Sequence, residues 1–171
     1  MPFEINLIGK IAQSNSQEAY NLNEKSSFGE PVSDKIQYTL YEAFYLLEKS
    51  KVNIISGKKT LSKNEVHKKF QSIDRKFSIK YPIFKDLREK GYIVKTALKF
   101  GADFRVYEKG IRPGDNHAKW IVFAEHESQK LNWNEFSAKN RVAHSTNKNL
   151  LLGILDEEGD ITYYEVKWVR P

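Results

Sequence analysis

Hydrophobic positions recur at two different spacings along this chain, and the change from one to the other divides it. Up to about residue 90, apolar residues return mainly every three or four positions, which is typical of helices that bury one face. Beyond that point, short runs rich in β-branched and aromatic residues follow one another. The pattern therefore predicts an α-rich first part and a second part that is mostly sheet.

In the first half of the α-rich part, up to residue 55, the pattern predicts two strands, a loop and a helix. Apolar residues within 3–8 favour a short strand, and the polar, turn-rich stretch 13–29 favours a loop. Ser33 is a candidate cap for a helix with apolar residues at spacings of 4, 4 and 3 over residues 36–47. A second short strand is expected at 51–55.

A capping box marks the next helix. Ser62 and Glu65 have the spacing at which each side chain can bond the other residue's backbone N–H. Val66, Phe70, Ile73 and Phe77 then mark one apolar face, which we expect to be core. Pro82 suits the first turn of a further helix, where no N–H is needed.

The second part predicts sheet around a single helix. We expect strands at 92–94, 96–98, 104–107 and 120–124, a helix over 134–146 capped at Asn132 or Asn134, a buried strand at 150–155, a hairpin loop at 156–160 and a returning strand at 161–169.

Composition narrows the class of protein. The 171 residues include no cysteine, which excludes a disulfide scaffold, a zinc ribbon and thiol catalysis. No apolar run has the length of a membrane span, and the first ten residues lack the features of a signal peptide. We therefore expect a cytoplasmic protein with no membrane partner, and its net charge of +6 together with many aromatic residues favours nucleic-acid binding.

The charge is unevenly distributed. Residues 1–80 carry a net charge of +4 and residues 81–171 a net charge of +2. The second value is low because four acids, Asp156, Glu157, Glu158 and Asp160, lie within five residues. The sequence thus predicts a basic body with one acidic projection.

Three side chains are candidates for chemistry, although each alone has an ordinary explanation. His117 follows a loop of turn residues and precedes a strand, so it could donate or accept a proton near neutral pH. Tyr107 ends the strand that enters this loop, a position that is usually structural. Lys148 follows a helix, where a cation usually stabilises the helix dipole.

Their surroundings resemble the archaeal tRNA-splicing endonuclease family. The resemblance rests on the strand Gly-Ala-Asp-Phe-Arg-Val-Tyr that ends at Tyr107, on the spacing Tyr-x9-His-x30-Lys that joins Tyr107, His117 and Lys148, on Arg-Val-Ala-His-Ser at 141–145 and on Tyr163-Tyr164. It is strong over residues 80–171, whereas residues 1–80 match the family in length and coarse pattern.

The resemblance implies an α+β fold of two domains. A small N-terminal α/β domain would span residues 1–79, and a restriction-endonuclease-like α/β catalytic domain with a mixed sheet would span residues 80–171. The implied function is excision of introns from precursor tRNA by cleavage of both strands of a bulge-helix-bulge.

The resemblance also implies a metal-independent mechanism without a cofactor. Tyr107 would act as general base on the ribose 2′-hydroxyl or only orient it, and His117 would protonate the 5′-oxygen. Lys148 would stabilise the extra negative charge of the transition state. The products would be a 2′,3′-cyclic phosphate and a 5′-hydroxyl.

Binding and assembly sites follow from the same resemblance. Arg141 and Trp168 would hold a bulged base between them. The acidic loop formed by Asp156, Glu157, Glu158 and Asp160 would dock into a basic cleft of a neighbouring subunit. The chain would form a homotetramer, or a heterotetramer with a second endonuclease subunit.

Two other functions stay open. Glu165 and Lys167 share a strand face and match the acidic-x-Lys element of metal-dependent nucleases. Alternatively, the chain could be a non-catalytic RNA-binding or assembly subunit, a function that the presence of all three candidate catalytic residues opposes.

Overall fold

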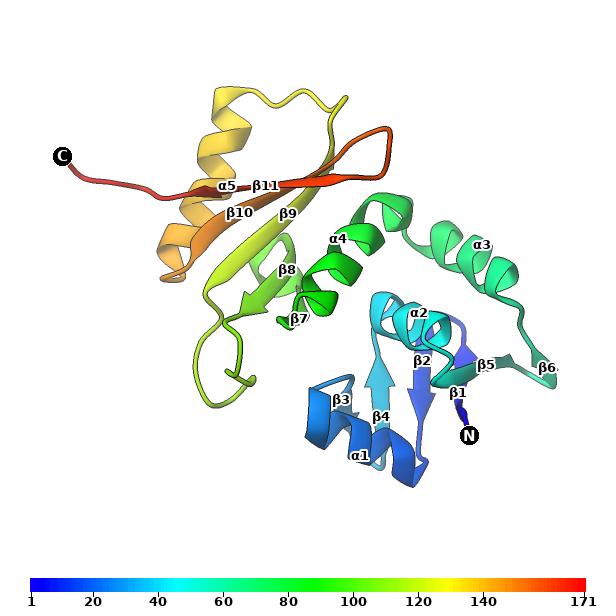
Figure 1. The fold of residues 1–171 in the computed structure, drawn as a ribbon. Coiled ribbons are helices and arrows are strands. Elements are labelled where there is room, and N and C mark those ends of the chain that lie inside the picture. Colours follow the sequence, from blue (N-terminus) through cyan, green and yellow to red (C-terminus); the bar gives the residue numbers. More distant parts are fainter. The chain divides into compact units, whose positions relative to one another are not determined.

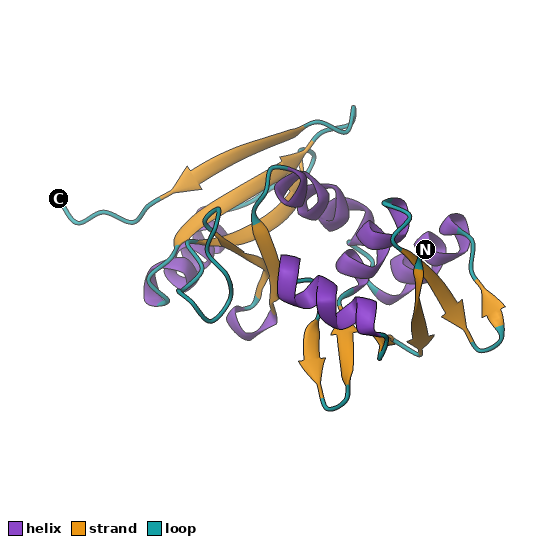
Figure 2. Ribbon diagram, turned by 60° about the horizontal axis from the view of Figure 1, so that its bottom comes forward, coloured by secondary structure: helices purple, strands orange, loops and turns teal.

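The computed structural model describes residues 1–171, which form two compact units, residues 1–78 and residues 79–171. Each unit combines helices with a mixed sheet, as Figures 1 and 2 show. The expected α+β class and the mixed sheet are thereby confirmed.

The first unit is built on a six-stranded sheet of order β3-β4-β2-β1-β5-β6, in which β1 and β5 are parallel and the other pairs antiparallel. Its strands are β1 (Phe3–Ile8), β2 (Ile11–Ser14), β3 (Glu30–Val32), β4 (Lys35–Tyr38), β5 (Val52–Ser56) and β6 (Lys59–Thr60). Its helices are α1 (Gln17–Ser26), α2 (Leu40–Glu48) and α3 (Lys63–Ile73).

A buried carboxylate fixes the start of α2. Glu42 is 2% exposed and accepts hydrogen bonds from the backbone N–H groups of Thr39 and Gly29, both at 3.0 Å. Thr39 in turn caps the helix by accepting from the Glu42 N–H. This capping box overrides the expected start at Ser33, which instead lies at φ 55° between β3 and β4.

Two expectations for the first unit are wrong. The stretch 13–29 contains α1, capped by Ser16, and the prediction missed this helix because Ala19 is its one buried residue, so no apolar face marks it. Ile36 lies in β4. The helix expected over 36–47 is therefore a strand followed by the shorter α2.

The capping box of Ser62 and Glu65 is confirmed at the start of α3. That helix ends at Ile73, and the last residue of the expected apolar face, Phe77, begins α4 (Phe77–Glu89) instead. Pro82 lies inside α4 and not in its first turn. The missing N–H of Pro82 costs this helix one internal hydrogen bond.

The second unit is built on a five-stranded sheet of order β11-β10-β9-β8-β7. Its strands are β7 (Ile93–Ala97), β8 (Ala102–Tyr107), β9 (Trp120–His126), β10 (Asn149–Leu155) and β11 (Ile161–Val166). A 3₁₀ turn η1 (Leu98–Phe100) connects β7 to β8, and helix α5 (Trp133–Ser145) connects β9 to β10. The two strands expected at 92–94 and 96–98 are thus one strand, β7, followed by this turn. Asn132 caps α5 through a capping box with Glu135.

The two faces of this sheet are covered by different helices. On one face, Phe84 of α4 packs against Phe104, with ring centroids 5.8 Å apart. On the other face, Ala143 of α5 is buried with Ile121 and Leu150. Figure 1 shows the sheet between these helices. None of the helices in the structure has the length and apolar character needed to cross a lipid bilayer.

Close packing of α4 on β10 generates a stability prediction. A Cβ atom on Gly153 would lie 3.1 Å from Cγ2 of Ile83. We expect Gly153→Val to lower the free energy of unfolding by about 1–3 kcal/mol through overpacking, as measured by urea denaturation. In the double variant with Ile83→Ala, the loss should be smaller than the sum of the two single losses, because the opposing atoms are gone. An unchanged stability of Gly153→Val would contradict this packing.

Candidate active site

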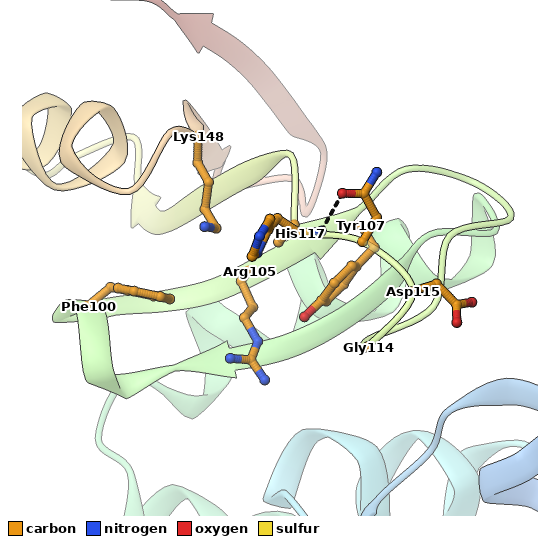
Figure 3. A pocket seen from close by; sticks show the side chains of 9 residues that line it. Phe100, Arg105, Tyr107, Gly114, Asp115, His117 and Lys148 are labelled. Atoms are coloured by element: carbon orange, nitrogen blue, oxygen red, sulfur yellow. Dashed lines mark hydrogen bonds between the residues drawn. The ribbon is translucent and has the colours of Figure 1, made fainter.

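A pocket of about 330 Å³ opens in the second unit. Figure 3 shows the side chains of Tyr107, His117 and Lys148 directed toward the same space. The residues that line the pocket are Phe100, Arg105, Tyr107, Gly114, Asp115, Asn116, His117, Ala118 and Lys148. The structure thus brings together the three residues that the sequence singled out for chemistry.

Strand direction explains this convergence. β9 and β10 are parallel, so their N-terminal ends lie at the same edge of the sheet, and the Asn149 N–H donates to the Lys119 carbonyl at 2.9 Å. β8 is antiparallel to β9, so its C-terminal end reaches this edge too, where the Lys119 N–H donates to the Val106 carbonyl at 2.9 Å. The residues that end β8 and precede β9 and β10 are Tyr107, His117 and Lys148.

Tyr107 is held rigidly at the last position of β8. It pairs with Ile93 of β7, and the whole residue is 6% exposed. Because successive strand residues alternate between faces, Tyr107 and Arg105 project from the same face of the sheet. Both line the pocket.

His117 is exposed at the end of a loop that is pinned at both ends. The Lys119 ammonium and the Glu108 carboxylate form an ion pair of 2.6 Å across the base of this loop. The His117 backbone N–H donates to Oδ1 of Asn116 at 2.8 Å. Gly114 lies at φ 98°, a conformation that favours glycine. The imidazole therefore stands at the mouth of the pocket on an anchored turn.

Lys148 lies between the end of α5 and β10. Its Nζ donates to the Thr146 carbonyl at 2.9 Å and lies 5.3 Å from the centroid of the Phe100 ring. Burial lowers the pKa of Lys148 below the usual range of lysine, and the positive charge of Arg105 lowers it further. An anion bound in the pocket would reduce this cost of keeping the lysine charged.

Arg105 and Phe100 are pocket residues that the sequence analysis missed. The signal for Arg105 was present, because a residue two positions before Tyr107 on a strand lies on the same face. Phe100 could not be found in this way. It lies between the strands expected at 96–98 and 104–107, where it closes the 3₁₀ turn η1.

The two residues expected to sandwich a base lie in α5 and after the end of β11. The Trp168 ring lies against His144, with centroids 4.5 Å apart, and the Arg170 guanidinium lies 5.5 Å from the Trp168 ring centroid. Arg141 is exposed on α5, one turn before His144. Trp168 itself is 47% exposed.

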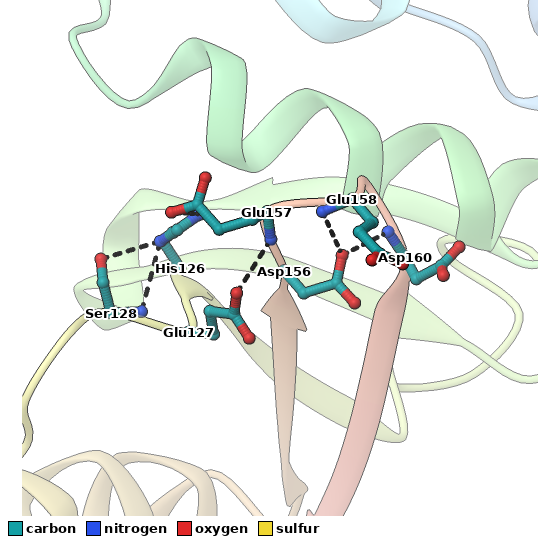
Figure 4. A network of polar contacts seen from close by, with 7 residues as sticks. All are labelled: His126, Glu127, Ser128, Asp156, Glu157, Glu158 and Asp160. Carbon is teal, nitrogen blue, oxygen red and sulfur yellow. Dashed lines mark hydrogen bonds and ion pairs between the residues drawn. The ribbon is translucent and has the colours of Figure 1, made fainter.

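The acidic loop joins β10 to β11, at the end of the strands opposite to the pocket. Figure 4 shows its polar contacts. One Asp156 carboxylate oxygen accepts from the backbone N–H groups of Glu158 and Asp160, at 2.9 and 2.8 Å. The Glu157 N–H donates to Glu127 at 3.0 Å, and its carboxylate lies 3.6 Å from His126. Asp156 therefore shapes the loop, while Glu157, Glu158 and Asp160 are exposed.

The alternative pair, Glu165 and Lys167, is not part of the pocket lining. The two side chains form an ion pair of 3.4 Å, and Glu165 also accepts a hydrogen bond from Asn149 at 2.8 Å. No group of three or more His, Asp or Glu side chains in the structure is placed to hold a metal ion.

Comparison with known proteins gives the family. The tRNA intron endonuclease N-terminal domain matches residues 6–67, and the tRNA intron endonuclease catalytic C-terminal domain matches residues 77–163. Proteins named tRNA-splicing endonuclease from Thermococcus onnurineus and Pyrococcus horikoshii are each 41% identical over 170 residues, covering 99% of this chain and 98% of theirs. One from Nanoarchaeum equitans is 45% identical over 82% of this chain and 93% of its own.

The match to the catalytic domain places the second unit in a class of RNA-cleaving endonucleases. The chain belongs to the tRNA intron endonuclease family.

The electrostatic coupling within the pocket can be measured directly. In an Arg105→Gln variant, we expect the pKa of Lys148 to rise toward the ordinary lysine value, because one neighbouring positive charge is lost. NMR titration of the lysine side chains checks this. Lys99→Gln removes a charge from an exposed residue outside the pocket lining, so it should leave the Lys148 titration unchanged. A pKa that does not move in Arg105→Gln would contradict the coupling.

Proposed function

We propose that this enzyme excises introns from precursor tRNA by cutting both strands of a bulge-helix-bulge, through attack of the ribose 2′-hydroxyl. The bond from the 2′-oxygen to phosphorus forms as the bond from phosphorus to the 5′-oxygen breaks. The products are a 2′,3′-cyclic phosphate and a 5′-hydroxyl. This chemistry requires no cofactor, because the nucleophile is already tethered beside the phosphate.

Each residue of the proposed triad has one task. Tyr107 accepts the proton of the 2′-hydroxyl or orients that hydroxyl, from a rigid position at the end of β8. His117 gives a proton to the departing 5′-oxygen, a task that suits imidazole near neutral pH. Lys148 stabilises the negative charge that grows on the phosphate oxygens.

The observation that carries this proposal is that one pocket is lined by all three residues. They come from three separate parts of the second unit, the end of β8, the loop before β9 and the link between α5 and β10. A proton acceptor, a proton donor and a cation around one cavity are the groups that cleavage by an internal hydroxyl requires.

For RNA recognition, we propose that Arg141 and Trp168 hold an unpaired base. A guanidinium and an indole both stack well on bases, and both residues are exposed. Since the Trp168 ring already packs against His144, the base would take the remaining part of the indole and Arg141 would move to meet it.

For assembly, we propose a tetramer, formed by four copies or with a second endonuclease subunit. The exposed carboxylates of Glu157, Glu158 and Asp160 would dock into a basic cleft of a neighbour. Strand β11 forms one edge of its sheet, and pairing of such edges between subunits would cover it.

The proposal is tested by cleavage of a precursor tRNA in excess EDTA, with analysis of the RNA ends. We expect the wild-type enzyme to cut and to leave cyclic phosphate ends. His117→Ala should reduce the cleavage rate by about 10²–10⁴-fold, the contribution of a general acid, while binding of the RNA persists.

Lys109→Ala is the matched control, because Lys109 is exposed on the same loop but does not line the pocket. It should cut at the wild-type rate. Loss of wild-type cleavage in EDTA would favour the metal-dependent alternative, and full activity of His117→Ala would refute its role as acid. If the pure chain bound RNA but cut only after a second subunit was added, the heterotetramer would be the active form.

A further inference from the structure

We propose that Arg105 is a second phosphate-binding cation of this pocket, which holds one non-bridging oxygen of the scissile phosphate while Lys148 neutralises the other. This inference rests on the proposed function and adds to it a residue outside the Tyr107, His117 and Lys148 triad. Arg105 makes no covalent bond and transfers no proton. Its role is to bind the charge that grows on phosphorus oxygens as the 2′-oxygen attacks.

Arg105 lies in the same pocket as the proposed triad. Arg105 lies on β8, where it pairs with Lys95 on one side and with Ile121 on the other. Its side chain projects from the same face as that of Tyr107. Figure 3 shows it between the rings of Phe100 and Tyr107, and all three line the pocket. A phosphate placed between Tyr107 and His117 for reaction would therefore lie within the space that Arg105 also lines.

Arg105 and Lys148 give this pocket two positive charges. The positive charge of Arg105 reaches Lys148, because it contributes to lowering the pKa of that lysine. Two half-buried cations in one pocket repel each other when nothing is bound, and an anion between them removes that repulsion. A phosphodiester brings one negative charge and gains more in the transition state, so two cations favour the transition state over the bound substrate.

The shape of the arginine side chain also suits a phosphate. Guanidinium presents planar, paired N–H donors and is the group that binds phosphate oxygens through two hydrogen bonds, whereas the lysine ammonium acts as a compact point charge. The pocket thus offers two different cationic groups for the two non-bridging oxygens of one phosphate.

The experiment measures the cleavage rate of Arg105→Gln, Arg105→Lys and the wild-type enzyme under single-turnover conditions, with the enzyme at a saturating concentration. We expect Arg105→Gln to lower the cleavage rate roughly 100-fold, as removal of one preorganised donor does, while the affinity for the RNA changes by less than about fivefold. Arg105→Lys keeps the charge but not the planar donors, so its cleavage rate should lie between that of Arg105→Gln and that of the wild-type enzyme. Lys99→Gln, an exposed residue beside Phe100 that does not line the pocket, should keep the wild-type rate.

A sulfur substitution in the RNA separates phosphate binding from a merely structural role. One non-bridging oxygen of the scissile phosphate is replaced by sulfur, a weaker acceptor of hydrogen bonds, and both diastereomers are tested. In the wild type, we expect one diastereomer to be cut about tenfold more slowly. In Arg105→Gln, the same substitution should have no further effect, because the donor it disturbs is already absent.

Each outcome decides the inference. The inference would be overturned if sulfur slowed cleavage by Arg105→Gln by the same factor as it slows cleavage by the wild-type enzyme. It would also be overturned if Arg105→Gln cut the unmodified RNA at the wild-type rate. Those results leave the proposed function intact, since the wild-type enzyme still cuts. If the wild-type enzyme itself failed to cut through the 2′-hydroxyl, the proposed function and this inference would both be refuted.

Discussion

The parallel pairing of β9 with β10 is the constraint on which the candidate active site depends. Parallel strands begin at the same edge of a sheet, so the loop that ends at His117 and the link that carries Lys148 meet there. The antiparallel pairing of β8 with β9 brings Tyr107 to the same place. A one-residue slip of β8 would turn Tyr107 and Arg105 to the opposite face, away from the histidine and the lysine.

The same register separates the charges of the chain. Lys148 immediately precedes β10 and Asp156 immediately follows it, and a strand of this length spans roughly 20 Å. The cationic pocket and the acidic loop therefore lie at opposite edges of one sheet. The net charge of +2 over residues 81–171 therefore includes two regions of opposite sign, and the carboxylates of the loop lie far from the pocket.

Local signals in the sequence predicted the elements whose ends are fixed by side chains. The capping box of Ser62 with Glu65 is confirmed, and Asn132 is the one of the two candidate caps, Asn132 and Asn134, that begins α5. The failures have a different cause. Thr39 and Glu42 form a local capping box at the start of α2, but the start was misplaced because Ile36, a residue of β4, continues the apolar spacing of the helix.

Some residues of the candidate site could be predicted from the sequence, and others could not. The spacing of Tyr107, His117 and Lys148 in a recognisable setting predicted the triad, and the structure brings these residues to one pocket. The contribution of Phe100 depends on the turn that follows β7, and the packing of Trp168 against His144 depends on how the chain end lies against α5. Neither arrangement follows from spacing, because each requires the packed structure.

The claim at the centre of this account is that the ribose 2′-hydroxyl at the junction is the nucleophile. A precursor tRNA with a single 2′-deoxynucleotide immediately before one cleavage site tests it most directly. The account predicts that this junction stays uncut while the other junction of the same molecule is cut at its normal rate. Cleavage at the deoxy junction would contradict the account, because it would require a nucleophile from outside the RNA.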